Sequence, residues 1–97
     1  MIVGKVVGNV VSTNKAERLI GKKLLVVQPV DMFTLESDGK PLVSIDSVGS
    51  GNGEIVMVVG GSSARQTTIT KDTPVDSAIV GVIDTIEIEG KQVFTKN

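Results

Sequence analysis

Hydrophobic and polar residues alternate along most of this chain in short runs, a pattern typical of β-strands. The second run is apolar throughout at residues 24–27, which predicts a strand buried on both faces or in an interface. Gly4 and Gly8 indicate bends or bulges in the first run, and residues 36–40 form a clear turn signal. We predict strands over residues 2–12, 22–30, 42–48, 54–59 and 82–89, and a short closing strand over 92–95.

One segment near the C-terminal end departs from this pattern and predicts a short helix over residues 74–80. Thr73 can cap its first turn, and Pro74 suits the first helical position because it lacks an amide hydrogen. Asp76 complements the positive end of the helix dipole. Five main strands with one short helix predict an all-β, five-stranded, OB-like barrel, since closure of the sheet removes its exposed edges.

The amino-acid composition favours the same fold class. Val, Ile and Thr make up 34 of the 97 residues, and such β-branched side chains favour strands. Two Phe with no Tyr and no Trp predict an aliphatic core. The length fits a single domain over residues 1–97. The mean hydropathy of +0.24 indicates that some apolar surface is buried against a partner.

Charge and reactive side chains exclude several classes of function. The 10 basic and 11 acidic residues are dispersed, whereas a nucleic-acid binder needs a basic face and, for single strands, stacking aromatics. With no His and no Cys, the chain builds no soft-metal site, disulfide, thiol nucleophile or His-based triad. Its apolar runs are too short to cross a bilayer. We expect a cytoplasmic protein that is not an enzyme and has no cofactor, metal, nucleic-acid or membrane partner.

The segment after the third predicted strand carries three glycines at alternate positions, Gly49, Gly51 and Gly53, with Ser50 and Asn52 between them. Residues this small let a backbone approach a ligand, or further copies of the same chain, very closely. A phosphate-binding loop would require a helix to follow, whereas a predicted strand comes next. The residues alone therefore indicate either a tight turn between strands or a surface of close contact.

Several motifs run in order along nearly the whole chain. They are Gly4-x-Val6, Thr13-x-Lys15, Leu19, Gly21-x-Lys23-Leu24-Leu25-Val26-Val27, Asp46-x-Val48-Gly49-x-Gly51-x-Gly53-Glu54, Gly61-Ser62-Ser63-Ala64-Arg65 and Pro74-Val75-Asp76-x-Ala78-Ile79-Val80-Gly81-Val82-Ile83-Asp84. Together they resemble the EutN/CcmL family, the vertex proteins of bacterial microcompartment shells. The resemblance implies an OB-like barrel that assembles as a homopentameric ring. It also implies that the ring caps the vertices of a cytoplasmic polyhedral shell and contacts hexameric shell proteins.

The resemblance also suggests which residues act in assembly. It favours an axis loop, in which five copies approach closely and Ser50 and Asn52 line a narrow polar opening. The complete predicted loop is Val48, Gly49, Ser50, Gly51, Asn52 and Gly53. Contacts between subunits are expected at Asp46, Arg65, Asp76 and Phe94. Arg65 is either a solvated surface charge or an interface residue that donates to a neighbour's backbone carbonyls or carboxylate, for which Asp46 and Asp76 are candidates. Phe94 would pack on its own barrel or on the next subunit.

Two other functions fit a small barrel. A small-molecule-binding barrel would use the glycine loop as a ligand clamp, and a monomer that binds a metabolite tightly would support it. A nucleic-acid-binding OB domain is the other alternative, and the low aromatic count and near-neutral charge argue against it. The pair Lys22 and Lys23 is expected on a solvated face or in contact with neighbouring shell tiles.

Overall fold

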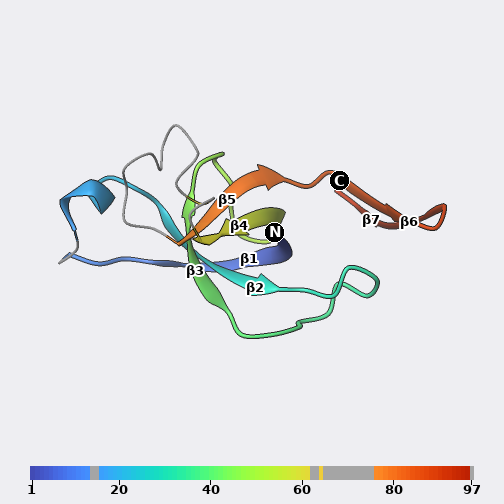
Figure 1. Ribbon diagram of the computed structural model, residues 1–97. Helices are drawn as coiled ribbons and strands as arrows, with labels where there is room; N and C mark the ends of the chain where they lie inside the picture. The colour runs from blue at the N-terminus through green and yellow to red at the C-terminus, as the bar shows by residue number, and fades with distance from the viewer. Residues whose placement is uncertain (14–15, 62–63, 65–75, 97) are drawn as a thin grey trace.

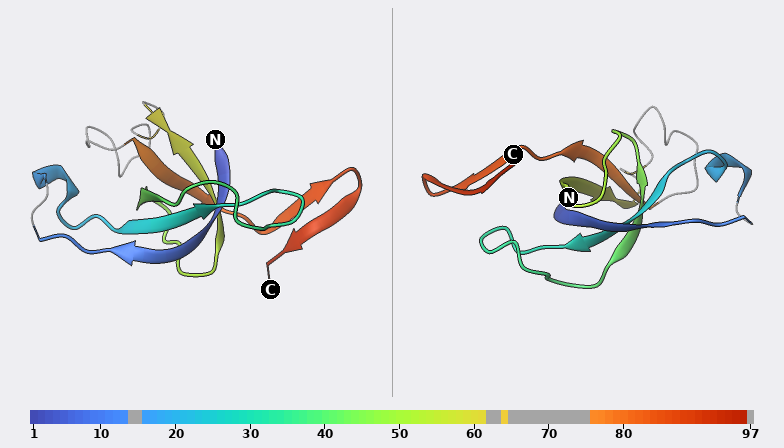
Figure 2. Two further views of the ribbon diagram at one scale, coloured as in Figure 1. Left: turned by 90° about the horizontal axis from the view of Figure 1, so that it is seen from below. Right: turned by 180° about the vertical axis from the view of Figure 1, so that it is seen from behind.

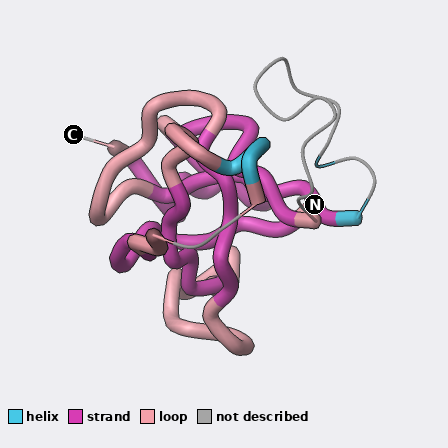
Figure 3. The backbone as a smooth tube through the Cα atoms, turned by 90° about the vertical axis from the view of Figure 1, so that its left-hand side faces the viewer, coloured by secondary structure: helices cyan, strands magenta, loops and turns pink. Residues whose placement is uncertain are grey.

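Five strands close into a barrel in the computed structural model, which describes residues 1–13, 16–61, 64 and 76–96 (Figures 1 and 3). The strands are β1 (Ile2–Val10), β2 (Leu24–Pro29), β3 (Leu42–Asp46), β4 (Ile55–Gly60) and β5 (Ser77–Val82), and a short 3-10 helix, η1 (Glu17–Leu19), lies between β1 and β2. Their order around the barrel is β1, β2, β3, β5, β4, and β4 pairs back onto β1. β3 and β5 run parallel, whereas the other neighbours are antiparallel. The predicted all-β, five-stranded barrel is confirmed.

The first strand is shaped by its two glycines. A Cβ at Gly4 would run into the Val27 side chain and lie 3.0 Å from the Gln28 carbonyl oxygen, so β1 and β2 approach too closely there for any larger residue. The pairing of β1 with β2 shifts register between Val6 and Gly8, which confirms the bulge predicted at Gly8. β1 can therefore bend enough to pair with β2 on one side and with β4 on the other.

The barrel interior is aliphatic, as the composition predicts. Its main cluster comes from β1, β2, β4 and β5 and contains Val6, Leu25, Val27, Val56, Val58 and Ile79, each at most 2% exposed. A second cluster at the β3–β5 side joins Ile45 with Ala64 and Ala78. Burial of these side chains supplies the main stabilisation of the fold, at about 25 cal/mol for each Å² of apolar surface removed from water.

The helix predicted over residues 74–80 is wrong for the part that the structure describes. Residues 77–80 belong to β5, and Ala78 and Ile79 are completely buried. Without β5, the facing edges of β3 and β4 would lack hydrogen-bond partners, because β5 lies between them in the barrel. This pairing outweighs the local capping signals at Thr73 and Pro74, which lie outside the described residues.

The strand predicted over residues 82–89 is also corrected, whereas the closing strand predicted over residues 92–95 is confirmed as a strand, Lys91–Thr95. The barrel's last strand ends at Val82, and the chain then forms a separate two-stranded sheet of β6 (Thr85–Ile88) and β7 (Lys91–Thr95). Figure 2 shows this hairpin extending away from the barrel. Its turn places Glu89 and Gly90 at φ values of 52° and 78°, as tight β-hairpins require. We call residues 84–96 the terminal arm.

Candidate functional site

The glycine-rich segment forms a loop, residues 47–54, between β3 and β4 at one end of the barrel; we call it the glycine loop. Gly49 and Gly53 have φ values of 79° and 86°, in the left-handed region that favours glycine. The Gly53 amide donates to the Val6 carbonyl at 2.8 Å, and the Val6 amide donates to the Glu54 carbonyl at 3.0 Å. The loop is therefore tied to β1 by backbone hydrogen bonds at its far end.

Asp46, the last residue of β3, organises the start of the loop from inside. Its Oδ1 accepts hydrogen bonds from the Val48 amide at 3.2 Å and from the Ser50 hydroxyl at 2.9 Å. Its side chain is only 3% exposed, and its Oδ2 lies 4.0 Å from Nζ of Lys23. Lys23 Nζ in turn donates to the Ser50 carbonyl at 2.9 Å. One buried carboxylate and one lysine thus hold the backbone around Ser50 in a single arrangement.

Ser50 differs from the sequence-based expectation in the direction of its side chain. The prediction placed its hydroxyl on a polar opening, whereas the structure buries the residue to 1% exposure and commits its hydroxyl to Asp46. Asn52 is exposed, as are Gly49 and Gly53. Val48 is 44% exposed. The outward surface of the loop in one copy is therefore formed mainly by backbone, Val48 and Asn52.

Glu54 fixes the other half of the loop. Its Oε1 accepts from the Gly51 amide at 2.7 Å, and its Oε2 accepts from Nζ of Lys96 at 2.6 Å. The Lys96 amide donates to the Asp84 carbonyl at 2.7 Å, which closes the base of the terminal arm. A single carboxylate therefore joins the centre of the glycine loop to the base of the arm.

Gly51 has no local explanation within one copy of the chain. Its φ lies outside the left-handed region. Among the described residues, a Cβ added there would meet only Oε1 of Glu54, at 3.8 Å, an ordinary van der Waals separation. Neither backbone conformation nor packing inside the barrel requires glycine at this position. A requirement for glycine would have to come from something outside this copy that approaches the loop closely.

The Glu54–Lys96 contact changes the acidity of both groups. Hydrogen bonds from Lys96 and from the Gly51 amide lower the pKa of the Glu54 carboxyl from its usual 4.5. The same contact raises the pKa of Lys96 from 10.5. The stabilisation linked to Glu54 is complete above pH 4.5 and is lost as the pH falls through its lower, folded-state pKa.

We expect the variant Glu54→Gln to be less stable than the wild type near neutral pH, and the difference to shrink in acid. The reason is that protonation of Glu54 removes the same charged contact that the substitution removes. Thermal unfolding of both proteins from about pH 6 to about pH 3 measures this convergence. Glu87→Gln, at an exposed position on the arm, controls for loss of one carboxylate. A wild-type advantage that persists unchanged through acid would contradict the assignment.

Two of the predicted interface residues, Asp76 and Phe94, lie apart from the glycine loop. Asp76 is exposed and stands just before β5, at the opposite end of that strand from the arm. Phe94 is half-buried on β7 and pairs across the hairpin with Ile86. Asp46 is turned inward and serves the loop of its own copy. Arg65 lies outside the described residues.

Sequence reasoning missed Lys23, Glu54 and Lys96 as parts of the site. The Lys22–Lys23 pair carried no signal beyond its charge, and Lys23 instead reaches the Ser50 carbonyl. Glu54 and Lys96 are 42 residues apart, so only the barrel brings them together. Within the described residues, no three acidic side chains gather as a metal site would require, and no helix has the length and hydropathy of a membrane span.

Fold and site together define a structural class. It is a small all-β barrel with a projecting hairpin and, at one end, a hydrogen-bonded loop whose surface is mainly backbone. The family model described as "Ethanolamine utilisation protein EutN/carboxysome" matches residues 1–84. The chain belongs to the EutN/CcmL family. This confirms the resemblance drawn from the motifs.

Relatives of known name and structure agree with this membership. The microcompartment shell vertex protein GrpN of Rhodospirillum rubrum is 53% identical over 87 residues, covering 90% of this chain and 97% of GrpN. A solved structure of the pentameric shell protein GrpN superposes with a TM-score of 0.82 at 51% identity, covering 91% of this chain and 99% of that one. CcmL of Nostoc superposes with a TM-score of 0.94 at 43% identity, covering 99% and 100%. These names are those of shell proteins, not of enzymes, and nothing in them favours the ligand-clamp alternative.

Proposed function

We propose that this chain is a vertex protein of a bacterial microcompartment shell and that five copies form a closed ring. The observation that carries the proposal is the similarity to pentameric GrpN over nearly the full length of both chains. The function is then geometric: no substrate is turned over, and the protein acts by the shape of its assembly. We place it in the shell, within the bacterial cytoplasm.

Physical reasoning supports a ring of five as the unit that closes a shell. Hexagonal tiles alone cover a flat sheet, and pentagonal units supply the curvature that a closed polyhedron needs. Identical subunits in such a ring make head-to-tail contacts, in which two different surfaces of the chain meet. The proposed partners are therefore further copies of this chain and, at the rim of the ring, hexameric shell proteins.

The glycine loop is our proposed contact at the ring axis. Gly51 supports this position, because its lack of a side chain has no explanation within one copy but would be required where five loops converge. Val48 and Asn52 offer exposed side chains to such a contact. Ser50 contributes its backbone, and Asp46 acts by holding the loop rather than by touching the neighbour.

Among the other proposed interface residues, Asp76 and Phe94 lie on surfaces that can reach a neighbour. Asp76 is exposed beside the start of β5, and Phe94 lies on the projecting arm. Arg65 is proposed from the sequence motif alone. We propose that all three residues act between subunits, Asp76 and Phe94 at a distance from the ring axis.

Native mass measurement tests the proposed function. We expect a species of five times the chain mass of 10.1 kDa. Co-expression with a hexameric shell protein should give closed polyhedral particles, and omission of this chain should give open sheets or tubes. A stable monomer at high concentration, or a different closed number under all conditions, would contradict the proposal.

A further inference from the structure

The terminal arm has an apolar face whose side chains are only half-buried. Ile86 and Phe94 pair across the hairpin, and Ile88 lies two residues along β6 on the same face. Within the described part of the chain, this sheet contains only β6 and β7 and pairs with no strand of the barrel. A two-stranded hairpin is marginal in water by itself, so an ordered one needs a surface to pack on.

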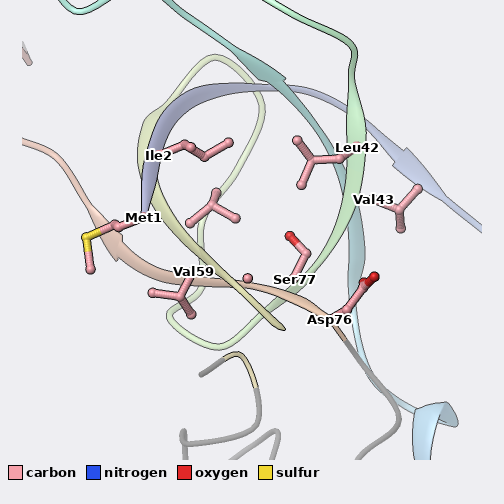
Figure 4. A pocket seen from close by; sticks show the side chains of 9 residues that line it. Met1, Ile2, Leu42, Val43, Val59, Asp76 and Ser77 are labelled. Atoms are coloured by element: carbon pink, nitrogen blue, oxygen red, sulfur yellow. The ribbon is translucent and has the colours of Figure 1, made fainter. Parts of the chain in front are cut away.

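A groove that suits such a face opens at the other end of the barrel (Figure 4). It has a volume of about 560 Å³ and lies where β1 and β3 begin and β4 ends, beside the start of β5. Figure 4 shows Ile2, Leu42 and Ser77 pointing toward a shared space. The walls are mostly apolar, with Asp76 at the rim. Ile2 is 41% exposed, so a large aliphatic side chain there faces solvent in a single copy.

The arm of one copy does not lie in that copy's own groove. β5 starts at Ser77, which lines the groove, and ends at Val82, next to the arm. Ile83 donates its amide to the Ile55 carbonyl at 2.8 Å, which holds the root of the arm at the opposite end of β4 from the groove. Lys96 closes the base of the arm through its contacts with Asp84 and Glu54. The arm is thus held pointing away from its own barrel (Figure 2).

We propose that the terminal arm of each copy packs its apolar face, Ile86, Ile88 and Phe94, into the β1–β3–β4 groove of the next copy. Arm and groove lie at opposite ends of β5, so the contact is head-to-tail and each copy both gives an arm and receives one. This inference rests on the proposed ring and identifies a second set of contacts in it, separate from the glycine loop. The arm is already folded and oriented, so little ordering entropy opposes docking.

Cross-linking tests the contact directly, because the wild-type chain has no cysteine. The double variant Ile88→Cys/Ile2→Cys, treated with a short bis-maleimide, should give covalent multimers up to five chains. The matched control Ile88→Cys/Val11→Cys should not, because Val11 is 85% exposed but lies just beyond the far end of β1, about 30 Å from Ile2 at the rise of an extended strand. Multimers in the control and not in the first variant would overturn the groove assignment.

Ring stability supplies the second measurement. Ile86→Ser/Phe94→Ser should raise the protomer concentration at which the ring half dissociates by roughly tenfold or more, since apolar anchors dominate such contacts. Thr85→Ser/Glu87→Ser, on the exposed face of the same arm, should leave it unchanged.

The outcomes separate this inference from the proposed function. A wild-type ring of five with no cross-link at Ile2 and no effect of the arm substitutions overturns the arm contact and leaves the vertex function standing. If the arm substitutions weaken the ring but the cross-link at Ile2 does not form, the arm packs on a different surface and the groove assignment is wrong. Absence of a wild-type ring overturns both.

Discussion

The variant Gly51→Val is expected to prevent the ring from closing while the barrel of each copy still folds. A Cβ at Gly51 meets no atom of the described residues closer than 3.8 Å in a single copy, so we expect the barrel to accommodate a side chain there. Where five loops converge, each copy would instead bring an extra side chain into a packed centre. Overpacking costs about 1–3 kcal/mol at one site, so five copies would cost the ring about 5–15 kcal/mol. Native mass and circular dichroism together should show a folded monomer.

Gly8→Val is the matched control for this prediction. Gly8 is another glycine without a left-handed φ, and the nearest atom to its Cβ position is 3.9 Å away. It pairs with Val26 of β2 and is not part of the glycine loop, so the ring of five should persist. If the Gly51→Val protein remained fully pentameric, the glycine loop would not lie at the ring axis. Loss of the ring in both variants would show that the effect is not specific to the loop.

Asp46→Ala is expected to be the most destabilising substitution of a charged residue in the described part of the chain, by about 2–4 kcal/mol in the free energy of unfolding. The change removes an acceptor for two hydrogen bonds and leaves the buried Ser50 hydroxyl without its partner. It also takes away the carboxylate 4.0 Å from Lys23. Chemical denaturation of the isolated variant, compared with wild type at the same protomer concentration, measures the loss.

Asp38→Ala controls for removal of an aspartate. Asp38 is exposed on the loop between β2 and β3, and its backbone amide rather than its carboxylate makes the contact with Pro29. Substitution there should change stability by less than about 0.5 kcal/mol.

Ser50→Ala should lose part of the stability that Asp46→Ala loses. The loss in the double variant should be smaller than the sum of the two single losses, because both substitutions break the same hydrogen bond. Full additivity would contradict the proposed role of Asp46.

Much of the barrel could be predicted because local patterns and the final pairing agree. Residues 24–27 are apolar on both faces, and the structure buries Leu25 and Val27 inside the barrel. The glycine loop was recognisable from spacing alone, and the positive φ values of Gly49 and Gly53 explain two of its three glycines. The ring of five was expected from the family resemblance, because the strand pattern of one chain carries no information about assembly.

The errors arose where distant partners decide the structure. Thr73, Pro74 and Asp76 are good helix-start signals, yet β5 forms because β3 and β4 both need a neighbour. Strand patterns do not say which sheet a strand joins, so the sequence alone does not separate the hairpin of β6 and β7 from the barrel. The inward turn of Ser50 follows from the position of Asp46, a hydrogen bond that glycine spacing does not reveal.

The two ends of the described chain lie at opposite ends of the barrel. Met1 lines the groove and is 81% exposed, whereas Lys96 is bound to Glu54 beside the glycine loop. A fluorophore attached at Met1 and another attached after Lys96 would therefore report on different faces of an assembled vertex. Protease or quencher added from outside an intact shell would reach one label before the other, which would reveal how the ring is oriented in its wall.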